Sequence, residues 1–135
     1  MANSLYTKGI EALMKGQVDL DTDTIKVTLI DVADYTVDLA AHDFINDVPA
    51  GARVATATLA NTTVTGGAFD ADDVTFSAVT GDQSEALVIW QDTGNEATSV
   101  LIYYGDTHTG LPVTPNGGDI SITWSSGASK IFKIG

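Results

Sequence analysis

The chain has 135 residues, of which 44% are hydrophobic and none is cysteine, so it fits one domain whose core packs without disulfides. The lack of cysteine also excludes thiolate metal sites and cysteine nucleophiles. Eighteen acidic residues against six basic ones give a formal net charge of −12, which repels phosphate backbones and anionic lipids. We therefore expect no direct binding to nucleic acid or to a membrane.

Residues 1–16 show the spacing of an amphipathic helix, with one face formed by Tyr6, Ile10, Leu13 and Met14. The helix is expected over residues 5–15, with Ser4 as its N-cap and Gly16 directly after its end. The segment lacks the regions of a secretory signal, and no window reaches the roughly 20 apolar residues of a membrane span. We expect a soluble protein made in a cytoplasm.

This predicted helix is short and contains Gly9, which costs about 1 kcal/mol relative to alanine, so the helix needs a surface to cover. Lys8 and Lys15 against Glu11 make the segment locally cationic in an acidic chain. Two alternatives follow: the helix covers the protein's own sheet, or it docks on another chain. Deleting residues 1–15 would unfold the protein in the first case and leave a folded domain that no longer assembles in the second.

Three aspartates at alternate positions, Asp19, Asp21 and Asp23, precede the first predicted strand. An EF-hand loop starting at Asp19 would need glycine at its sixth place and glutamate at its twelfth, but Thr24 and Ile30 stand there. We expect Asp19 and Asp21 to shape a turn by accepting backbone N–H bonds, and Asp23 to be a polar residue at the strand edge. No metal site is expected.

From residue 24 onward, apolar and polar residues alternate with the period of half-buried strands, over 24–31, 53–60, 73–79, 119–124 and 130–134. Residues 85–90 and 98–104 are continuously apolar, which predicts central strands covered on both faces. The pattern predicts a mainly β fold: an antiparallel β-sandwich or small open barrel of about seven to eight strands, with one short N-terminal helix. The helix would occupy residues 1–16 and a single β-rich domain residues 17–135.

Residues 35–53 are the least strand-like part of the chain and are expected to form a surface loop or a single helical turn. Because recognition is often carried by loops, this segment joins the helix as a candidate assembly interface. The candidate interface residues are Tyr6, Lys8, Ile10, Leu13, Met14, Lys15, His42 and Phe44.

Catalytic motifs are missing from the sequence: it has no G-x-S-x-G elbow, Walker lysine loop, G-x-G-x-x-G turn or H-E-x-x-H helix. His108 stands in a turn-like stretch and is expected to be exposed, and His42 lies beside Asp43, which would face the other way on a strand. We expect no catalytic residue, no cofactor and no enzymatic activity. Core packing is expected for the strand aromatics Trp90, Trp124, Tyr103 and Tyr104, although they could stack on a carbohydrate.

Several long segments, in order, resemble a group of small virion proteins of tailed bacteriophages. They are "LID..DYTVDLAAHDFINDVPAGARVA", "DDVTFSAVTGDQSEALVIWQDTG", "ATSVLIYYGDT", "GLPVTPNGGDISITW" and "KIFKIG", and the resemblance runs from about residue 3 to the end. It implies a non-enzymatic component of the particle, in first place a capsid decoration or cement protein bound to the outer shell in many copies.

The resemblance also implies the partners and the location. The partners would be the major capsid protein or other virion proteins, with further copies of the chain as a homo-oligomer. The location would be the virion, after synthesis in the host bacterial cytoplasm. A minor tail or tail-tip protein is the alternative, and a carbohydrate-binding β-sandwich module is a further one.

Overall fold

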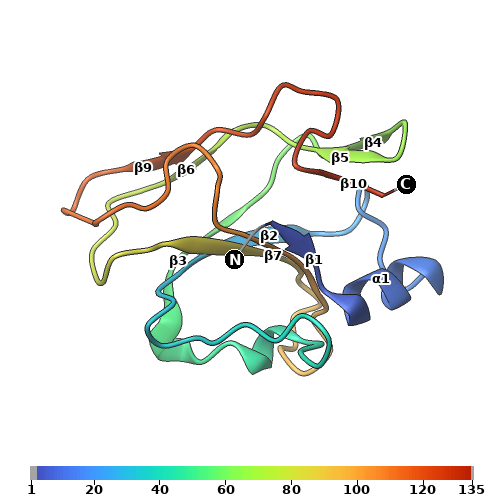
Figure 1. Ribbon diagram of the computed structural model, residues 1–135, viewed down its shortest axis with the longest axis horizontal. Helices are drawn as coiled ribbons and strands as arrows, with labels where there is room; N and C mark the ends of the chain where they lie inside the picture. The colour runs from blue at the N-terminus through green and yellow to red at the C-terminus, as the bar shows by residue number, and fades with distance from the viewer. Residues whose placement is uncertain (1–2, 135) are drawn as a thin grey trace.

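The computed structural model describes residues 3–134, and its central element is a five-stranded antiparallel sheet (Figure 1). The strand order is β1-β8-β7-β2-β3, formed by Ser4–Leu5, Leu101–Gly105, Ala86–Gln91, Ile25–Ile30 and Arg53–Thr58. A second sheet, β10-β5-β4, contains Phe132–Lys133, Ala68–Asp70 and Thr63–Thr65. The third pairs β6 (Val74–Phe76) with β9 (Ile120–Ile122). The two small sheets lie over one face of the large sheet, so the fold is roughly a β-sandwich.

The predicted mainly β, antiparallel sandwich with one helix is confirmed, with ten strands in residues 3–134 instead of seven to eight. The unpredicted strands are β1, β4 and β5. β4 and β5 form a hairpin whose turn contains Gly66 and Gly67 at φ 62° and 79°, the positive values that tight hairpin turns require. Strand β4, Thr-Val-Thr, has only three residues and is exposed at all of them, so its alternation is too short to predict a half-buried strand. Residues 1, 2 and 135, which belong to the predicted units 1–16 and 17–135, lie outside the described residues.

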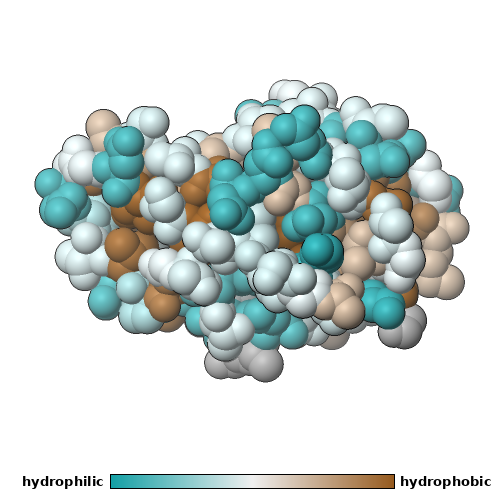
Figure 2. All heavy atoms as spheres, turned by 90° about the horizontal axis from the view of Figure 1, so that it is seen from above, coloured by the Kyte–Doolittle hydropathy of each residue, from teal (hydrophilic) through white to brown (hydrophobic). Residues whose placement is uncertain are grey.

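Both faces of the large sheet are buried, as predicted for its two apolar strands β7 and β8. The first hydrophobic cluster packs between the large sheet and the small sheets and includes Val27, Leu29, Leu87, Ile89, Ile102, Phe69, Phe76 and Ile122. Side chains of the opposite face form the second cluster, with residues of the 31–52 segment, and include Ile30, Val88, Trp90, Leu101, Ile45, Val48 and Ala52. Seen from the small-sheet side, hydrophobic residues appear as small areas between hydrophilic ones (Figure 2).

The 31–52 segment runs across the second face of the large sheet (Figure 1) and contains two 3-10 turns, Ile45–Asp47 and Ala50–Ala52. Arg53, the first residue of β3, fastens this segment to the sheet. Its guanidinium donates to the carbonyl oxygens of Ile45 and Val48 at 2.8 Å, and to both carboxylate oxygens of Glu96 at 2.9 Å. This hydrogen bonding lowers the pKa of the Glu96 carboxyl. The loop is therefore a fixed cover of the core.

Helix α1, Thr7–Met14, is shorter than the predicted 5–15, because Ser4 and Leu5 pair with Tyr104 and Tyr103 as strand β1. Ser4 is therefore not the N-cap; Tyr6 holds that place without a side-chain cap. The predicted end is confirmed, since Gly16 at φ 72° donates to the Leu13 carbonyl and Gln17 donates to the Ala12 carbonyl, a Schellman motif. No helix in residues 3–134 has the length and apolar content to cross a membrane.

Candidate functional site

The candidate interface residues of the helix fall on different sides of it. Tyr6 is fully buried in the core, whereas Met14 keeps 81% of its surface exposed. Ile10 and Leu13 are partly buried, and the fully buried positions within the helix are Gly9 and Ala12. The helix therefore packs on the sheet through its smallest residues. Its apolar side chains range from the buried Tyr6 to the exposed Met14 and form no single exposed face.

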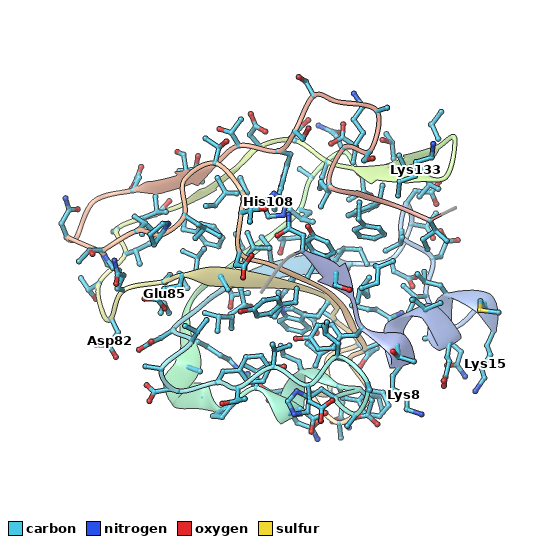
Figure 3. The ribbon with its side chains drawn as sticks, in the orientation of Figure 1. Lys8, Lys15, Asp82, Glu85, His108 and Lys133 are labelled. Atoms are coloured by element: carbon cyan, nitrogen blue, oxygen red, sulfur yellow. The ribbon has the colours of Figure 1, made fainter. Side chains whose placement is uncertain are left out.

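A small groove of about 130 Å³ lies between the helix and residues 43–44 of the 31–52 segment, and it brings together Lys8, Lys15 and Phe44. We call this the helix groove; Glu11, Gln17, Asp43 and Val100 also line it. Lys8 pairs with Glu11 at 3.6 Å, and Lys15 forms no ion pair within residues 3–134. Figure 3 shows both lysines on the helix at one end of the molecule and Asp82 and Glu85 at the other end.

His42 does not line this groove. Its ring stacks on Tyr35 with centroids 5.3 Å apart, and its Nδ1 lies 2.8 Å from the Tyr35 hydroxyl. The Tyr35 hydroxyl in turn lies 2.8 Å from that of Tyr6, so three rings form a chain from the surface into the core. Burial raises the pKa of Tyr35 to about 12 and that of Tyr6 further, so both phenols stay protonated and act as donors. This arrangement ties the loop to the start of the helix.

The prediction that His108 is exposed is wrong. The residue is only 8% exposed, its Nε2 lies 2.8 Å from the Tyr103 hydroxyl, and its ring stands edge-on to Trp124 at 5.0 Å between centroids. Gly105 makes room for it, since a Cβ there would lie 2.7 Å from Nε2. Burial lowers the pKa of His108, while the Asp106 carboxylate acts in the opposite direction. The turn-like sequence around His108 could not predict these contacts, because Trp124 comes from a distant part of the chain.

The aspartates before β2 form a turn, and the Asp19 carboxyl accepts backbone N–H bonds from Asp21 and Thr22, as predicted, whereas Asp23 has a larger role than predicted. The Asp23 carboxylate accepts from the Asp19 backbone N–H at 2.8 Å and from Gln91 Nε2 at 2.7 Å, so Asp23 is more than a polar edge residue. Hydrogen bonding with Asp21 and Thr22 lowers the pKa of the Asp19 carboxyl. Hydrogen bonding with Asp19 and the charge of its carboxylate raise the pKa of Asp21. The Asp19 and Asp21 carboxyl groups bond to each other, and the Asp23 carboxylate bonds to the Asp19 backbone and to Gln91.

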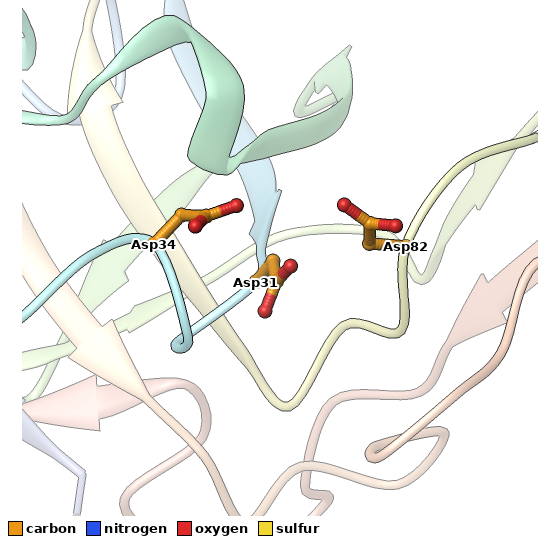
Figure 4. Close-up of side chains that lie close together, drawn as sticks. All are labelled: Asp31, Asp34 and Asp82. Carbon is orange, nitrogen blue, oxygen red and sulfur yellow. The ribbon is translucent and has the colours of Figure 1, made fainter.

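Three other carboxylates converge at the opposite end of the molecule from the helix, where Asp31, Asp34 and Asp82 lie within 4.8 Å of one another (Figure 4). Asp31 is buried and accepts the Ala33 backbone N–H at 2.9 Å, whereas the other two are exposed. Asp31 follows β2 directly, and Asp82 comes from the loop before β7, so their proximity depends on the pairing of these strands. Oxygen ligands of this kind suit a hard cation such as Ca²⁺.

None of the four aromatic residues that could stack on a sugar offers an open face. Trp90, Trp124, Tyr103 and Tyr104 are all between 2% and 8% exposed. Trp90 donates its indole N–H to Thr28 at 2.9 Å, and Trp124 donates to the Asp72 carbonyl at 3.0 Å. All four are core residues, and the polar atoms of Trp90, Trp124 and Tyr103 are hydrogen-bonded.

The chain was compared with protein-family models and with curated proteins, and neither comparison gave a significant match. The expectation of a phage virion protein therefore rests on the sequence segments quoted above.

Proposed function

We propose that this protein is a non-enzymatic structural component of a tailed-phage particle, and specifically a capsid decoration protein that binds the outer shell in many copies. The ordered resemblance from about residue 3 to the end carries the proposal. The geometry supports it in a general way, because both faces of the large sheet are covered and Arg53 fixes the long loop. A particle subunit must present its contacts on a rigid body.

The helix groove is the proposed contact with the major capsid protein or with another copy of the chain. It places Lys8, Lys15 and Phe44 beside one another at the end of the molecule remote from Asp82 and Glu85. A subunit with a net charge of −12 is repelled by acidic neighbours, and in this groove Lys8 and Lys15 balance the charges of Glu11 and Asp43, so the repulsion is smaller here than over the acidic surface. Tyr6 is fully buried in the protein's own core and cannot contact a partner, so the contact would use the outer side of the helix.

The test is to locate the protein in imaged particles and to count its copies. Many copies on the outer shell are expected, whereas a few copies at the tail would support the minor tail alternative. The variant Lys8→Glu with Lys15→Glu should fold normally and should be lost from particles. Lys133→Glu is the matched control, because it reverses an exposed lysine on β10, away from the helix (Figure 3). Normal incorporation of the double variant would remove the helix groove from the proposal.

A further inference from the structure

A larger pocket, of about 470 Å³, lies between β1, the end of β8, the 107–109 loop and the segment that leads into β10. Its volume falls within the roughly 300–1,000 Å³ typical of small-molecule sites. Residues 3–5, 103–109 and 123–133 form its wall, so the fold brings together three distant parts of the sequence. We call this the β10 pocket; it is distinct from the helix groove.

Hydroxyl groups and lysines dominate the wall of the β10 pocket. Eighteen of the 135 residues are acidic, but no aspartate or glutamate lines the pocket within the described residues. Two of the six basic residues, Lys130 and Lys133, do line it. The hydroxyl-bearing residues around the opening are Ser4, Thr107, Thr109, Thr123, Ser125 and Ser129. In a protein of this charge, such a wall repels an anion less than the acidic surface does, and a carboxylate that does act on a residue of the wall is that of Asp106, whose charge acts to raise the pKa of His108.

The two lysines are also free to bind a ligand. Among the basic side chains, Lys8, Lys26 and Arg53 each pair with a carboxylate, whereas within residues 3–134 Lys130 and Lys133 pair with none. Lys130 adopts a left-handed backbone with φ 51°, which non-glycine residues rarely do and which often marks a functional position. A lysine ammonium on its flexible stem donates up to three hydrogen bonds to an oxyanion.

The floor of the β10 pocket is built before any ligand arrives. Tyr103 stacks on Phe132 with centroids 5.2 Å apart and hydrogen-bonds to His108, whose ring stands against Trp124. Tyr103, His108 and Phe132 line the pocket, Trp124 supports His108 from behind, and each of the four is less than 9% exposed. A preformed floor lowers the cost of ordering side chains on binding.

We propose that the β10 pocket binds a small hydroxylated anion, with its phosphate or carboxylate group at Lys130 and Lys133 and its hydroxyl groups at the serine and threonine side chains around the opening. Sugar phosphates and sugar acids share this chemistry. The site is separate from the helix groove, and its occupation does not depend on the assembly role.

The test is calorimetric titration of the full chain, at constant ionic strength, with glucose 6-phosphate, glucuronate, inorganic phosphate and glucose. The first two should bind saturably, inorganic phosphate more weakly, and glucose not measurably. Lys130→Gln with Lys133→Gln should weaken binding by about tenfold or more, because each lost charge-assisted hydrogen bond is worth at least the free energy of one factor of ten. Lys8→Gln with Lys15→Gln is the matched control and should bind as the unaltered protein does.

Three results would overturn the proposal. The first is the absence of saturable binding of either sugar anion, and the second is unchanged binding in the double variant, or in Lys133→Gln alone if the double variant does not fold. Equal affinity for inorganic phosphate and glucose 6-phosphate would overturn the part assigned to the hydroxyl groups.

Discussion

The imidazole of His108 is buried against Tyr103 and Trp124, so its charged form is disfavoured in the folded protein and its pKa is lowered. In the unfolded chain the same residue takes up a proton near the ordinary histidine pKa of about 6.5. The unfolded state therefore binds more protons as the pH falls below that value, and folding stability decreases. Above it both states are neutral and the contribution to stability is complete.

We predict that the free energy of unfolding falls more steeply between pH 7.5 and pH 5.5 in the unaltered protein than in His108→Gln. The variant is less stable at every pH, since it loses the ring contacts, but its slope against pH should be smaller. Urea denaturation at several pH values measures both quantities. His42→Gln is the comparison, and equal slopes for the unaltered protein and His108→Gln would show that His108 is not the group responsible.

Thr28 is a fully buried polar residue whose hydroxyl accepts the Trp90 indole N–H at 2.9 Å and contacts the Thr56 hydroxyl at 2.8 Å. Thr28→Val keeps the shape of the side chain but leaves the indole N–H without its acceptor inside the sheet. We predict a loss of about 1–3 kcal/mol in the free energy of unfolding, the cost of an unsatisfied buried donor.

Chemical denaturation with tryptophan fluorescence measures this loss. Thr56→Val is the matched control, because it removes the exposed hydroxyl and leaves the bond between Thr28 and Trp90 in place. A similar loss in both variants would assign the effect to the threonine pair instead of the indole.

At the scale of the elements, helix α1 depends on the missing side chain of Gly9. A Cβ at this position would lie 2.5 Å from the Leu101 carbonyl oxygen and 2.9 Å from the Ile102 Cα, both backbone atoms of β8 that cannot move aside. Glycine is therefore what allows the helix to approach the sheet so closely, although it is a poor helix former.

We predict that Gly9→Ala destabilises the protein by about 1–3 kcal/mol, because overpacking outweighs the gain in helix propensity. Thermal denaturation followed by circular dichroism measures it. The control is Lys8→Ala, at an exposed position of the same helix, which should change stability little. An increase in stability for Gly9→Ala would mean that the helix does not pack on β8 in solution.

The elements with a regular pattern could be predicted from the sequence, and those held by long-range pairing could not. Strands β2, β3, β7 and β8 follow from alternation or from a continuous apolar run. Strand β1 has two residues and exists because Ser4 and Leu5 pair with β8, a contact that no local pattern reveals. Strand β4 is short and has no buried face, so only the two-glycine turn that follows it could have indicated the hairpin.

The candidate site was partly predictable. The cationic helix and the residue 35–53 segment were singled out separately, and Lys8, Lys15 and Phe44 do line one groove. The β10 pocket was not predictable, since its wall combines both ends of the chain with the loop around His108. Only the fold brings those segments together.

At the scale of the whole molecule, residues 3–15 belong to the fold. They supply strand β1, the fully buried Tyr6 and the close contact of Gly9 with β8. We predict that deleting residues 1–15 gives an insoluble protein or one without a cooperative unfolding transition, because losing a buried aromatic alone costs several of the roughly 5–15 kcal/mol that stabilise a domain.

Size-exclusion chromatography and thermal denaturation test this. Met14→Ser, on the exposed side of the helix, is the control and should unfold as the unaltered protein does. A truncated protein that remains monomeric and cooperative would mean that the helix is dispensable for folding and serves contacts with other chains.

The pairing of Ser4 with Tyr104 has a consequence for how the chain is synthesised. The two residues are 100 positions apart, and ribosomes add about 5–20 residues per second. Ser4 is therefore translated roughly 5 to 20 s before its partner Tyr104. During that interval Leu5 and Tyr6 have no native partner in β8, so the nascent chain carries an uncovered apolar segment until β8 has been made.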